Sequence, residues 1–412
     1  MRFISSFFNV RYLPILIIYI GIISIFSAEE LVSDRLRYWN FSNNLLEGFY
    51  FDNNHTLWNG PGFPLYIAFV RLFGLGWEVI VFINSLLLYF SVMIFNQIML
   101  NNNTPKAFYL TYLFAFWEPV LLYQYLPHLM TEVFSIFLIS CFTYIMLKPK
   151  DLKRNILLGI ILSFIILTKV IFAYVALSMF LISFLFKKLR DQRFYQIPGY
   201  AILFCVPYLI YTYNLTGKIF YFSNAGGSSF YWMTSPQSDL RGDWNGGNGY
   251  TQNSPNLASE QYNEYLKNNT WPIFEKIEHL GWVEQDQELK RIAVENITKQ
   301  KAKFIKNWIN NLGRLLYGYP FSFHTPNWQH ILVTIKQSFF IVFFVFALYL
   351  FVINYTRISP EYLFLIAFLL IYLIGVSLLS AYPRFLFITN IISWTIIINA
   401  FRKHIKIKLI SR

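Results

Sequence analysis

The sequence predicts an all-α polytopic membrane protein, and three observations support this fold class. Apolar residues make up 56% of the 412 positions and charged residues only 13%, which is less charge than a soluble domain of this size carries. Apolar runs of roughly 17 to 25 residues recur along the chain, and each is long enough to cross about 30 Å of hydrocarbon as a helix. Short basic segments separate several of these runs, as in the cytoplasmic loops of membrane proteins.

The apolar runs define about ten spans, counted from a cytoplasmic amino terminus. They cover residues 11–27, 77–99, 108–126, 130–147, 155–168, 170–186, 195–214, 336–354, 361–381 and 385–401. The loops between spans alternate in charge, because the net basic ones are 101–107, 148–154, 187–193 and 355–360. This alternation predicts that both termini are cytoplasmic. The fifth span is short, so its boundary with the sixth is the least sharply marked one.

The net charge of +13 is explained by topology rather than by a nucleic-acid partner. Lysine and arginine gather in the segments "KPKDLKR" and "KKLRDQR" and in the tail "RKHIKIKLISR", where the positive-inside rule expects them. Cys141 and Cys205 both fall inside predicted spans, so we interpret them as core residues rather than as a disulfide or a metal pair. The first apolar run has features of a signal peptide, but the topology needs it as a retained helix.

The spans divide the chain into three regions. Residues 1–214 form an N-terminal transmembrane module of about seven helices, which includes a first outer loop over 28–76. Residues 215–335 form an outer-face segment, and residues 336–412 form about three further spans and a basic cytoplasmic tail. In the first outer loop, "NGPGFPLYIAFVRLFG" is apolar but broken by proline and glycine, which predicts an interfacial helix rather than a span.

The outer-face segment has two parts of different character. The first part, "SNAGGSSFYWMTSPQSDLRGDWNGGNGYTQNSPN", is rich in Gly, Asn, Ser and Pro and predicts irregular loop. The second part, "EQDQELKRIAVENITKQKAKFIKNWINNLGRLLYG", has apolar residues at helical spacing with lysines among them. It predicts helical structure that rests on anionic headgroups. A direct role of these lysines in ligand binding is the alternative.

Four charged residues are predicted to lie at the outer membrane face: Asp34, Glu132, Lys169 and Arg384. A charge at the edge of the hydrocarbon costs several kcal/mol unless it is paired or hydrated, so such residues are candidates for function. Two carboxylates and two cations suit transfer from a phosphate-bearing donor, because a base activates the nucleophile while cations stabilise the leaving phosphate. The alternative is that the four are helix-end anchors that reach for headgroups.

Other site patterns are weak. His128 and Glu132 are four residues apart and could form a metal site with Asp34, but no further nearby His or Cys supports it. The sequence therefore neither indicates nor excludes a bound divalent metal. The chain has no "GxxxxGK[ST]" run and no "GxGxxG" after a strand, so a soluble nucleotide is not indicated, and no cofactor is expected.

Six segments in order along the chain resemble the GT-C superfamily of polytopic glycosyltransferases, in the branch of aminoarabinose transferases and protein O-mannosyltransferases. They are "SDRLRYWNFSNNLLEG", "NGPGFPLYIAFVRLFG", "LMTEVF", "ILTKVI", "YNLTGKIFYFSNAGGSSFYW" and "AYPRFLFITNII". These enzymes use a sugar carried on a polyprenyl phosphate. Protein O-mannosyltransferases have an Asp-Glu pair in the first loop, whereas here Asp34 is followed by Arg35.

The resemblance implies a role for each candidate residue. Asp34 would be the general base for an inverting transfer, and Glu132 would position the donor or the acceptor. Substrate binding, to the lipid phosphate or the sugar, would involve Lys169, Arg384, Arg35, Arg37 and His128. The implied partners are a polyprenyl-phosphate sugar, a lipid, glycan or protein acceptor, and the bilayer, and the lipid-linked sugar is a co-substrate. The implied location is a bacterial inner membrane with the site on the periplasmic or extracellular side.

Two other functions remain open at the level of sequence. A transporter or flippase of a lipid-linked sugar or other anion could use the same cations, but charged residues deep in the other spans are not evident. A non-catalytic membrane subunit would tolerate changes at all four charges. Geometry discriminates between the enzyme and the anchors: Asp34, Glu132, Lys169 and Arg384 should converge for an enzyme and should scatter around the perimeter for anchors.

Overall fold

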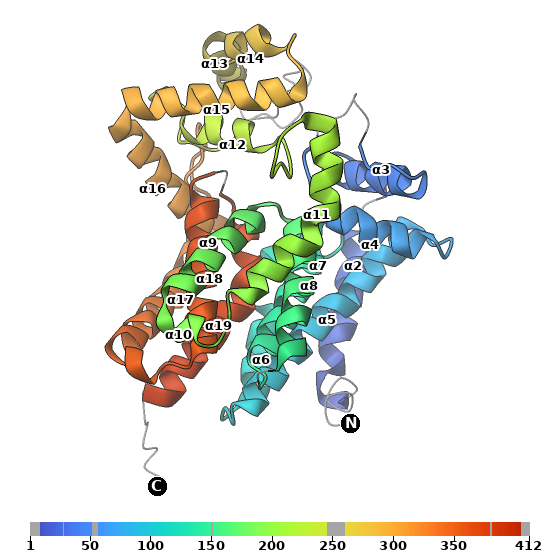
Figure 1. Cartoon of the computed structure of the whole chain (residues 1–412), viewed down its shortest axis with the longest axis vertical. Coiled ribbons are helices and arrows are strands. Elements are labelled where there is room, and N and C mark those ends of the chain that lie inside the picture. Colours follow the sequence, from blue (N-terminus) through green and yellow to red (C-terminus); the bar gives the residue numbers. More distant parts are fainter. Residues whose placement is uncertain are drawn as a thin grey trace.

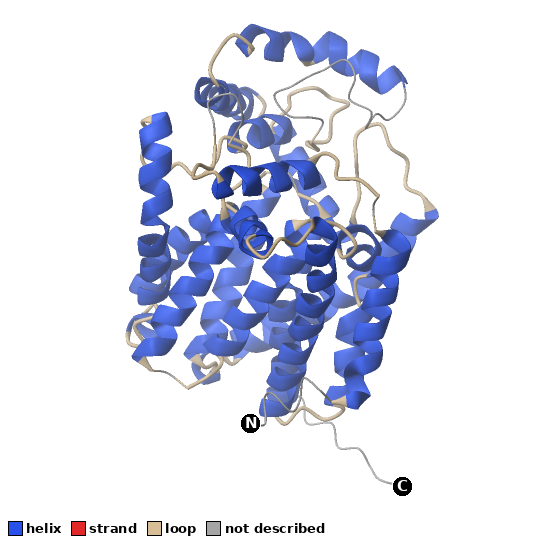
Figure 2. Cartoon of the chain, turned by 90° about the vertical axis from the view of Figure 1, so that its right-hand side faces the viewer, coloured by secondary structure: helices blue, strands red, loops and turns tan. Residues whose placement is uncertain are grey.

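The computed structural model describes residues 9–27, 29–51, 57–149, 151–244, 260–379 and 381–404. Throughout these residues the regular structure is helical, and they contain no strand (Figures 1 and 2). Ten helices of the described chain stand side by side as a bundle: α2 (Leu13–Phe26), α5 (Trp77–Asn101), α6 (Ala107–Phe116), α7 (Thr131–Met146), α8 (Leu152–Thr168), α9 (Ile171–Leu185), α11 (Gln196–Thr216), α17 (Trp328–Ile353), α18 (Pro360–Ser377) and α19 (Pro383–His404).

Among the described residues, four helices are long and apolar enough to cross a membrane. They are the helical stretches Trp77–Asn101, His330–Ile353, Pro360–Ser377 and Pro383–Arg402, which belong to α5, α17, α18 and α19. The apolar stretches of α2, α6, α7 and α9 are shorter. A helical membrane protein is thus supported, and each predicted span except the third coincides with one helix of the bundle.

Two helix boundaries differ from the predicted spans for local reasons. The eighth span was predicted to begin at residue 336, but α17 begins at Trp328, because Asn327 and His330 form a capping box at its start. The third span was predicted as one helix over 108–126. It is interrupted after α6, and a π-helix (Leu121–Tyr125) follows Pro119, which has no N–H to continue the α-helical ladder.

The bundle core is aromatic and centred on α7. This helix packs against α5, α8 and α19, and its inward face is buried along most of its length. Phe142 on α7 stacks on Phe368 with ring centroids 5.4 Å apart, and Phe172 stacks on Tyr372 at 4.5 Å. Because α7 is surrounded, a charged side chain in its first turn must be placed among neighbouring helices rather than in solvent.

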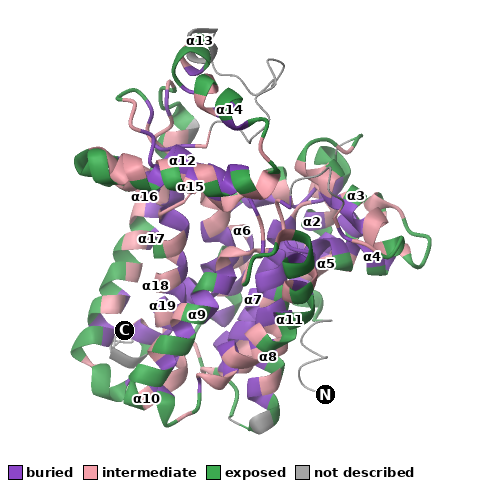
Figure 3. Cartoon of the chain, turned by 45° about the horizontal axis from the view of Figure 1, so that its top comes forward, coloured by how far each residue is buried: buried purple, intermediate pink, exposed green. Residues whose placement is uncertain are grey.

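Figure 3 shows that buried residues fill the middle of the bundle and that exposed ones line its outer faces. On α17 the exposed side chains are strongly apolar, and they include Phe339 at 64%, Val342 at 65% and Val352 at 73% exposure. An apolar outer face of this length is the surface that lipid tails cover in a membrane protein. The placement of α17 therefore agrees with its composition.

Two helices of the first outer loop lie across one end of the bundle. They are α3 (Asp34–Leu46) and α4 (Gly62–Arg71), which pack on each other, and α4 also contacts α8 (Figure 1). Phe63 and Ile67 of α4 are fully buried, whereas Phe69 is 61% exposed. The predicted short helix in "NGPGFPLYIAFVRLFG" is confirmed as a helix that does not traverse the bundle.

The same end of the bundle carries a second helical layer, here called the head. It consists of α12 (Gly226–Met233), α13 (Glu260–Asn269), α14 (Trp271–Ile277), α15 (Trp282–Lys299) and α16 (Lys301–Tyr317) (Figure 1). The irregular loop predicted after residue 222 is wrong over α12, because its Trp232 packs into a small core with Phe274 and Leu289. The Gly-rich stretch 246–250 lies outside the described residues.

Asp286 fixes α12 against α15. Its carboxylate is fully buried, accepts the Gly227 backbone N–H at 2.5 Å, and pairs with Lys290. A carboxylate at the first turn of a helix is stabilised by the free N–H groups there. A Cβ at Gly227 would lie 2.1 Å from the Asp286 carbonyl oxygen, so glycine is required for this approach.

Candidate active site

The four charged residues predicted for the outer face lie at the end of the bundle beneath the head. Asp34 begins α3, Glu132 lies in the first turn of α7, Lys169 ends α8, and Arg384 lies in the first turn of α19. Figure 1 shows α3 at the end of the bundle that carries the head. The segments are far apart in sequence, so the fold alone brings them to one end.

Glu132 is the centre of an ionic cluster with both predicted cations. Its side chain is fully buried, and its Oε1 lies 3.0 Å from Lys169 Nζ and 4.0 Å from Arg384 Nε. Lys169 is 14% exposed and Arg384 is 28% exposed. Two positive charges face one carboxylate, so the three residues together carry a net charge of +1.

The helix ends favour this arrangement of charge. Glu132 is in the first turn of α7, where the free N–H groups attract an anion, and Lys169 follows the last turn of α8, where free carbonyls attract a cation. The dipoles contribute only about 0.3–1 kcal/mol each. The larger effect is the pairing itself, because an unpaired Glu132 carboxylate at this depth would lose several kcal/mol of hydration.

Arg384 has unused hydrogen-bonding capacity. Its contact with Glu132, at 4.0 Å, is an ion pair longer than a hydrogen bond, and no described residue accepts a hydrogen bond from its guanidinium. The side chain lies near two rings, with its central carbon 5.6 Å from the Tyr382 ring and 5.2 Å from the Phe385 ring. A guanidinium held between rings and left without an acceptor is a suitable group to bind an anion.

Asp34 stands beside this cluster without joining it. It forms a direct ion pair with Arg37 one turn further along α3, and its charge lies within electrostatic range of Lys169 and Arg384. The preceding Ser33 adopts φ 53° and ψ −126°, a backbone conformation that residues with side chains rarely adopt.

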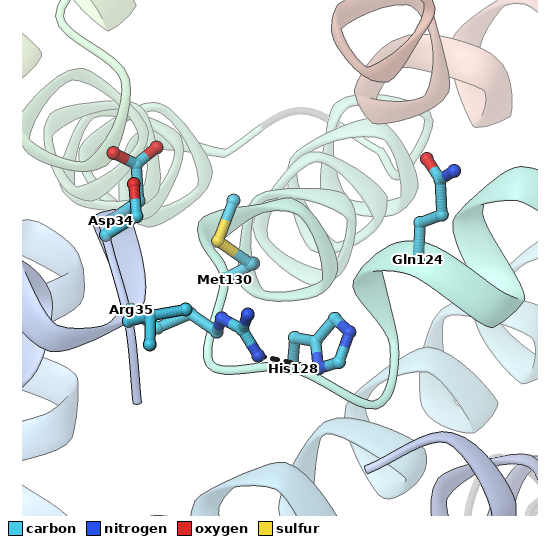
Figure 4. A pocket seen from close by; sticks show the side chains of 7 residues that line it. Asp34, Arg35, Gln124, His128 and Met130 are labelled. Carbon is cyan, nitrogen blue, oxygen red and sulfur yellow. Dashed lines mark hydrogen bonds between the residues drawn. The ribbon is translucent and has the colours of Figure 1, made fainter. Parts of the chain in front are cut away.

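Arg35 and His128 form a separate pair. Arg35 Nη1 lies 3.3 Å from His128 Nδ1, and both line a cavity of about 220 Å³ that Asp34, Gln124 and Met130 also border (Figure 4). His128 thus shares this cavity with Asp34, whereas Glu132 does not line it. The described residues hold no group of three metal-ligating side chains, and the metal arrangement left open by the sequence is not formed within them.

The segments that flank α12 meet the first outer loop beside Arg37, through aromatic rings that the sequence did not single out. Arg37 lies 5.8 Å from the Trp58 ring, and Trp58 lies edge-on to Trp244 with ring centroids 5.8 Å apart. The Asn224 N–H donates to the Leu57 carbonyl at 2.9 Å and ties the same two segments together. The contact between these tryptophans could not be predicted from residue spacing, because they come from two irregular segments.

A second ionic cluster, also missed, lies inside the bundle between α6, α17 and α19. The Glu118 carboxylate pairs with Lys336 at 2.5 Å and accepts hydrogen bonds from Gln337 at 3.1 Å and Asn390 at 3.0 Å. The expectation that the other spans lack internal charge is therefore wrong. The signal was present, because Glu118 falls within the third predicted span and Lys336 is the first residue of the eighth.

Comparison of the chain with models of protein families, with curated proteins and with solved structures gave no match.

Two glycines let the first outer loop contact the end of α8 next to Lys169. A Cβ at Gly60 would lie 2.2 Å from the Leu167 carbonyl oxygen, and a Cβ at Gly62 would lie 2.5 Å from Thr168 Oγ1 and 2.7 Å from its backbone nitrogen. Any larger residue must push the loop away from α8. The glycines of "NGPGFP" thus serve close packing at the site.

Gly62→Ala is expected to lower the free energy of unfolding by about 1–3 kcal/mol, the usual cost of overpacking a tight contact. Thermal unfolding of the purified full-length protein in detergent measures this as a lower melting temperature. Gly21→Ala is the matched control, because a Cβ at Gly21 in α2 meets nothing within 4 Å. Equal melting temperatures for the two variants would contradict the close approach.

Proposed function

We propose that the protein is a membrane glycosyltransferase of the GT-C class that crosses the bilayer about ten times. It moves a sugar from a polyprenyl-phosphate donor to an acceptor hydroxyl, with inversion, at the extracytoplasmic face of a bacterial inner membrane. In this proposal the head end faces outward and both termini are cytoplasmic. The basic α10 (Lys187–Arg190), which lies at the end of the bundle opposite the head, supports this orientation (Figure 1).

The observation that carries the proposal is the arrangement of charge around Glu132. Lys169 and Arg384 both face its buried carboxylate, the cluster keeps a net charge of +1, and Arg384 has no hydrogen-bond acceptor among the described residues. A phosphate is the anion that such a pair of cations binds well. The cluster lies at the end of an apolar bundle, where a lipid-linked phosphate could reach it from the bilayer.

The mechanism needs a base and stabilisation of the leaving group. Asp34 accepts the proton of the acceptor hydroxyl as its oxygen attacks the anomeric carbon on the side opposite the phosphate. The new C–O bond forms while the bond to the phosphate oxygen breaks, and the electron pair leaves with the polyprenyl phosphate. Lys169 and Arg384 stabilise the additional negative charge on that phosphate. The proton ends on Asp34 and the configuration at the sugar carbon is inverted.

Glu132 and Arg37 act as positioning residues in this scheme. Glu132 holds the two cations at fixed places without neutralising both, and Arg37 holds the Asp34 carboxylate through their ion pair. Positioning of this kind is effective because the lipid phosphate is already a good leaving group, so alignment of the reactants supplies much of the rate.

The test is to incubate the purified full-length protein with a panel of polyprenyl-phosphate sugars and to measure release of polyprenyl phosphate by mass spectrometry. We expect one donor of the panel to be cleaved and to raise the melting temperature, because a ligand that binds the native state stabilises it. Arg384→Gln should abolish that stabilisation. The matched control Arg357→Gln removes an exposed arginine in the turn between α17 and α18 and should retain it.

A flippase would give a different result in the same system. Reconstituted in vesicles, it would move the lipid-linked sugar across the bilayer intact and release no polyprenyl phosphate. That outcome, or donor-induced stabilisation that survives in Arg384→Gln, would refute the proposed transfer.

A further inference from the structure

The cavity beside α3 is distinct from the Glu132 cluster. It lies between the Val32–Arg35 turn and the segment from Gln124 to Met130 that leads into α7. Figure 4 shows Arg35 extending toward His128 across this space, while the Asp34 carboxylate points in a different direction from the same helix turn. Asp34 thus stands at the border between the cavity and the phosphate-binding cluster proposed above.

The cavity contains an uncompensated positive charge. Asp34 pairs with Arg37, and no carboxylate among the described residues lies within ion-pairing distance of Arg35. Arg35 is half-buried, and it uses one of its five N–H donors on His128. None of its nitrogens is both buried and unpartnered, so the donors that His128 does not use are accessible, and Arg35 lines the cavity. An anion in the cavity would offset this charge.

His128 adds a second donor rather than a competing acceptor. A guanidinium can only donate, so Nδ1 of His128 must accept, which places the ring proton on Nε2. Burial, together with the adjacent Arg35, lowers the pKa of His128 below its usual value of 6.5, so the ring is neutral at neutral pH. Arg35 and the Nε2–H group then both offer hydrogens to a bound group, and Gln124 offers an amide nearby.

We propose that this cavity is an anion-binding subsite for the acceptor, in which Arg35 binds a carboxylate or phosphate group carried close to the hydroxyl that reacts. The assignment to an acceptor rests on the proposed transfer, whereas the anion site rests on the cavity itself. The volume of about 220 Å³ is below the roughly 300–1,000 Å³ of pockets that enclose a drug-sized ligand, so the cavity accommodates one group of the acceptor. The acceptor is then an acidic glycan or lipid headgroup.

Isothermal titration calorimetry with inorganic phosphate and with acetate, on the full-length protein in detergent, tests the subsite. Polyprenyl phosphate is added in a parallel series to occupy the Lys169–Arg384 site. We expect Arg35→Gln to weaken phosphate binding at least about tenfold in the presence of the lipid, because it removes the charge-assisted hydrogen bonds. Acetate that binds as well as phosphate identifies a general anion site, and binding of phosphate alone identifies a phosphate group.

Two controls separate a binding effect from misfolding. Arg35→Lys keeps the charge and should restore part of the phosphate affinity, and Arg291→Gln removes an arginine on the exposed face of the head and should change nothing. Phosphate binding that is unaffected by Arg35→Gln would overturn the anion site. Arg35-dependent phosphate binding in a protein that cleaves no polyprenyl-phosphate sugar would overturn only the acceptor assignment.

Discussion

Asp34→Asn is expected to reduce sugar transfer by at least about a hundredfold, the lower range of what a general base contributes. Asparagine keeps the size of the side chain but cannot accept the hydroxyl proton. Lys169 and Arg384 still bind the phosphate, so donor-induced stabilisation should persist. The cost to folding should be small, since the Asp34 and Arg37 side chains are 34% and 31% exposed and a partly hydrated pair contributes about 1 kcal/mol or less.

Glu47→Gln provides the matched control for this prediction. Glu47 is the exposed acid that follows the last residue of the same helix α3, and the change is the same loss of one carboxylate. Transfer measured with the donor identified in the panel should be normal in Glu47→Gln. An Asp34→Asn enzyme with more than about a tenth of normal activity would exclude Asp34 as the base.

The helices of the bundle could be predicted from the sequence because a helix in hydrocarbon must satisfy its backbone internally and be apolar along its length. Each predicted span except the third coincides with one helix, but the two features set by local chemistry were missed, the start of α17 at the Asn327 cap and the break of the third span at Pro119. In the head, the helical part that contains α15 and α16 was predicted, whereas α12 was predicted as irregular loop. Helix α12 is stabilised by tertiary contacts such as those of Trp232 and Asp286. A local pattern in a Gly-rich segment does not reveal such contacts.

For the site, sequence reasoning identified which residues to compare but not how they pair. Topology predicted that Glu132, Lys169 and Arg384 share one face of the membrane, and the structure joins them in one cluster. Arg35 and Arg37 are two residues apart on α3 and so point to different sides of the helix, but which of them faces the cavity depends on how α3 is rotated on its neighbours, which spacing alone does not set. Glu118 and Lys336 were missed as a pair because each is a single charge in an otherwise apolar run, Glu118 near the middle of the third predicted span and Lys336 at the start of the eighth.

Lys336→Met is expected to be the most destabilising of these changes, at about 3 kcal/mol or more, because it leaves the Glu118 carboxylate in the bundle without a cation. Glu118 is 6% exposed, and Lys336 is the only cation among the described residues within ion-pairing distance of it. Lys301→Met, at an exposed position on α16, is the matched control and should be close to neutral. Thermal unfolding of the full-length protein in detergent measures both.

The double variant Glu118→Gln with Lys336→Met tests why Lys336→Met destabilises the protein. The cause is either the unpaired charge of Glu118 or the lost packing of the lysine side chain. Glutamine still accepts from Gln337 and Asn390, and methionine fills much of the lysine volume, so the double variant should be clearly more stable than Lys336→Met alone. If the two changes instead add, the pair has no interaction energy. In that case α17 is held to α19 by apolar packing alone, and the Glu118 cluster does not fix the position of that helix.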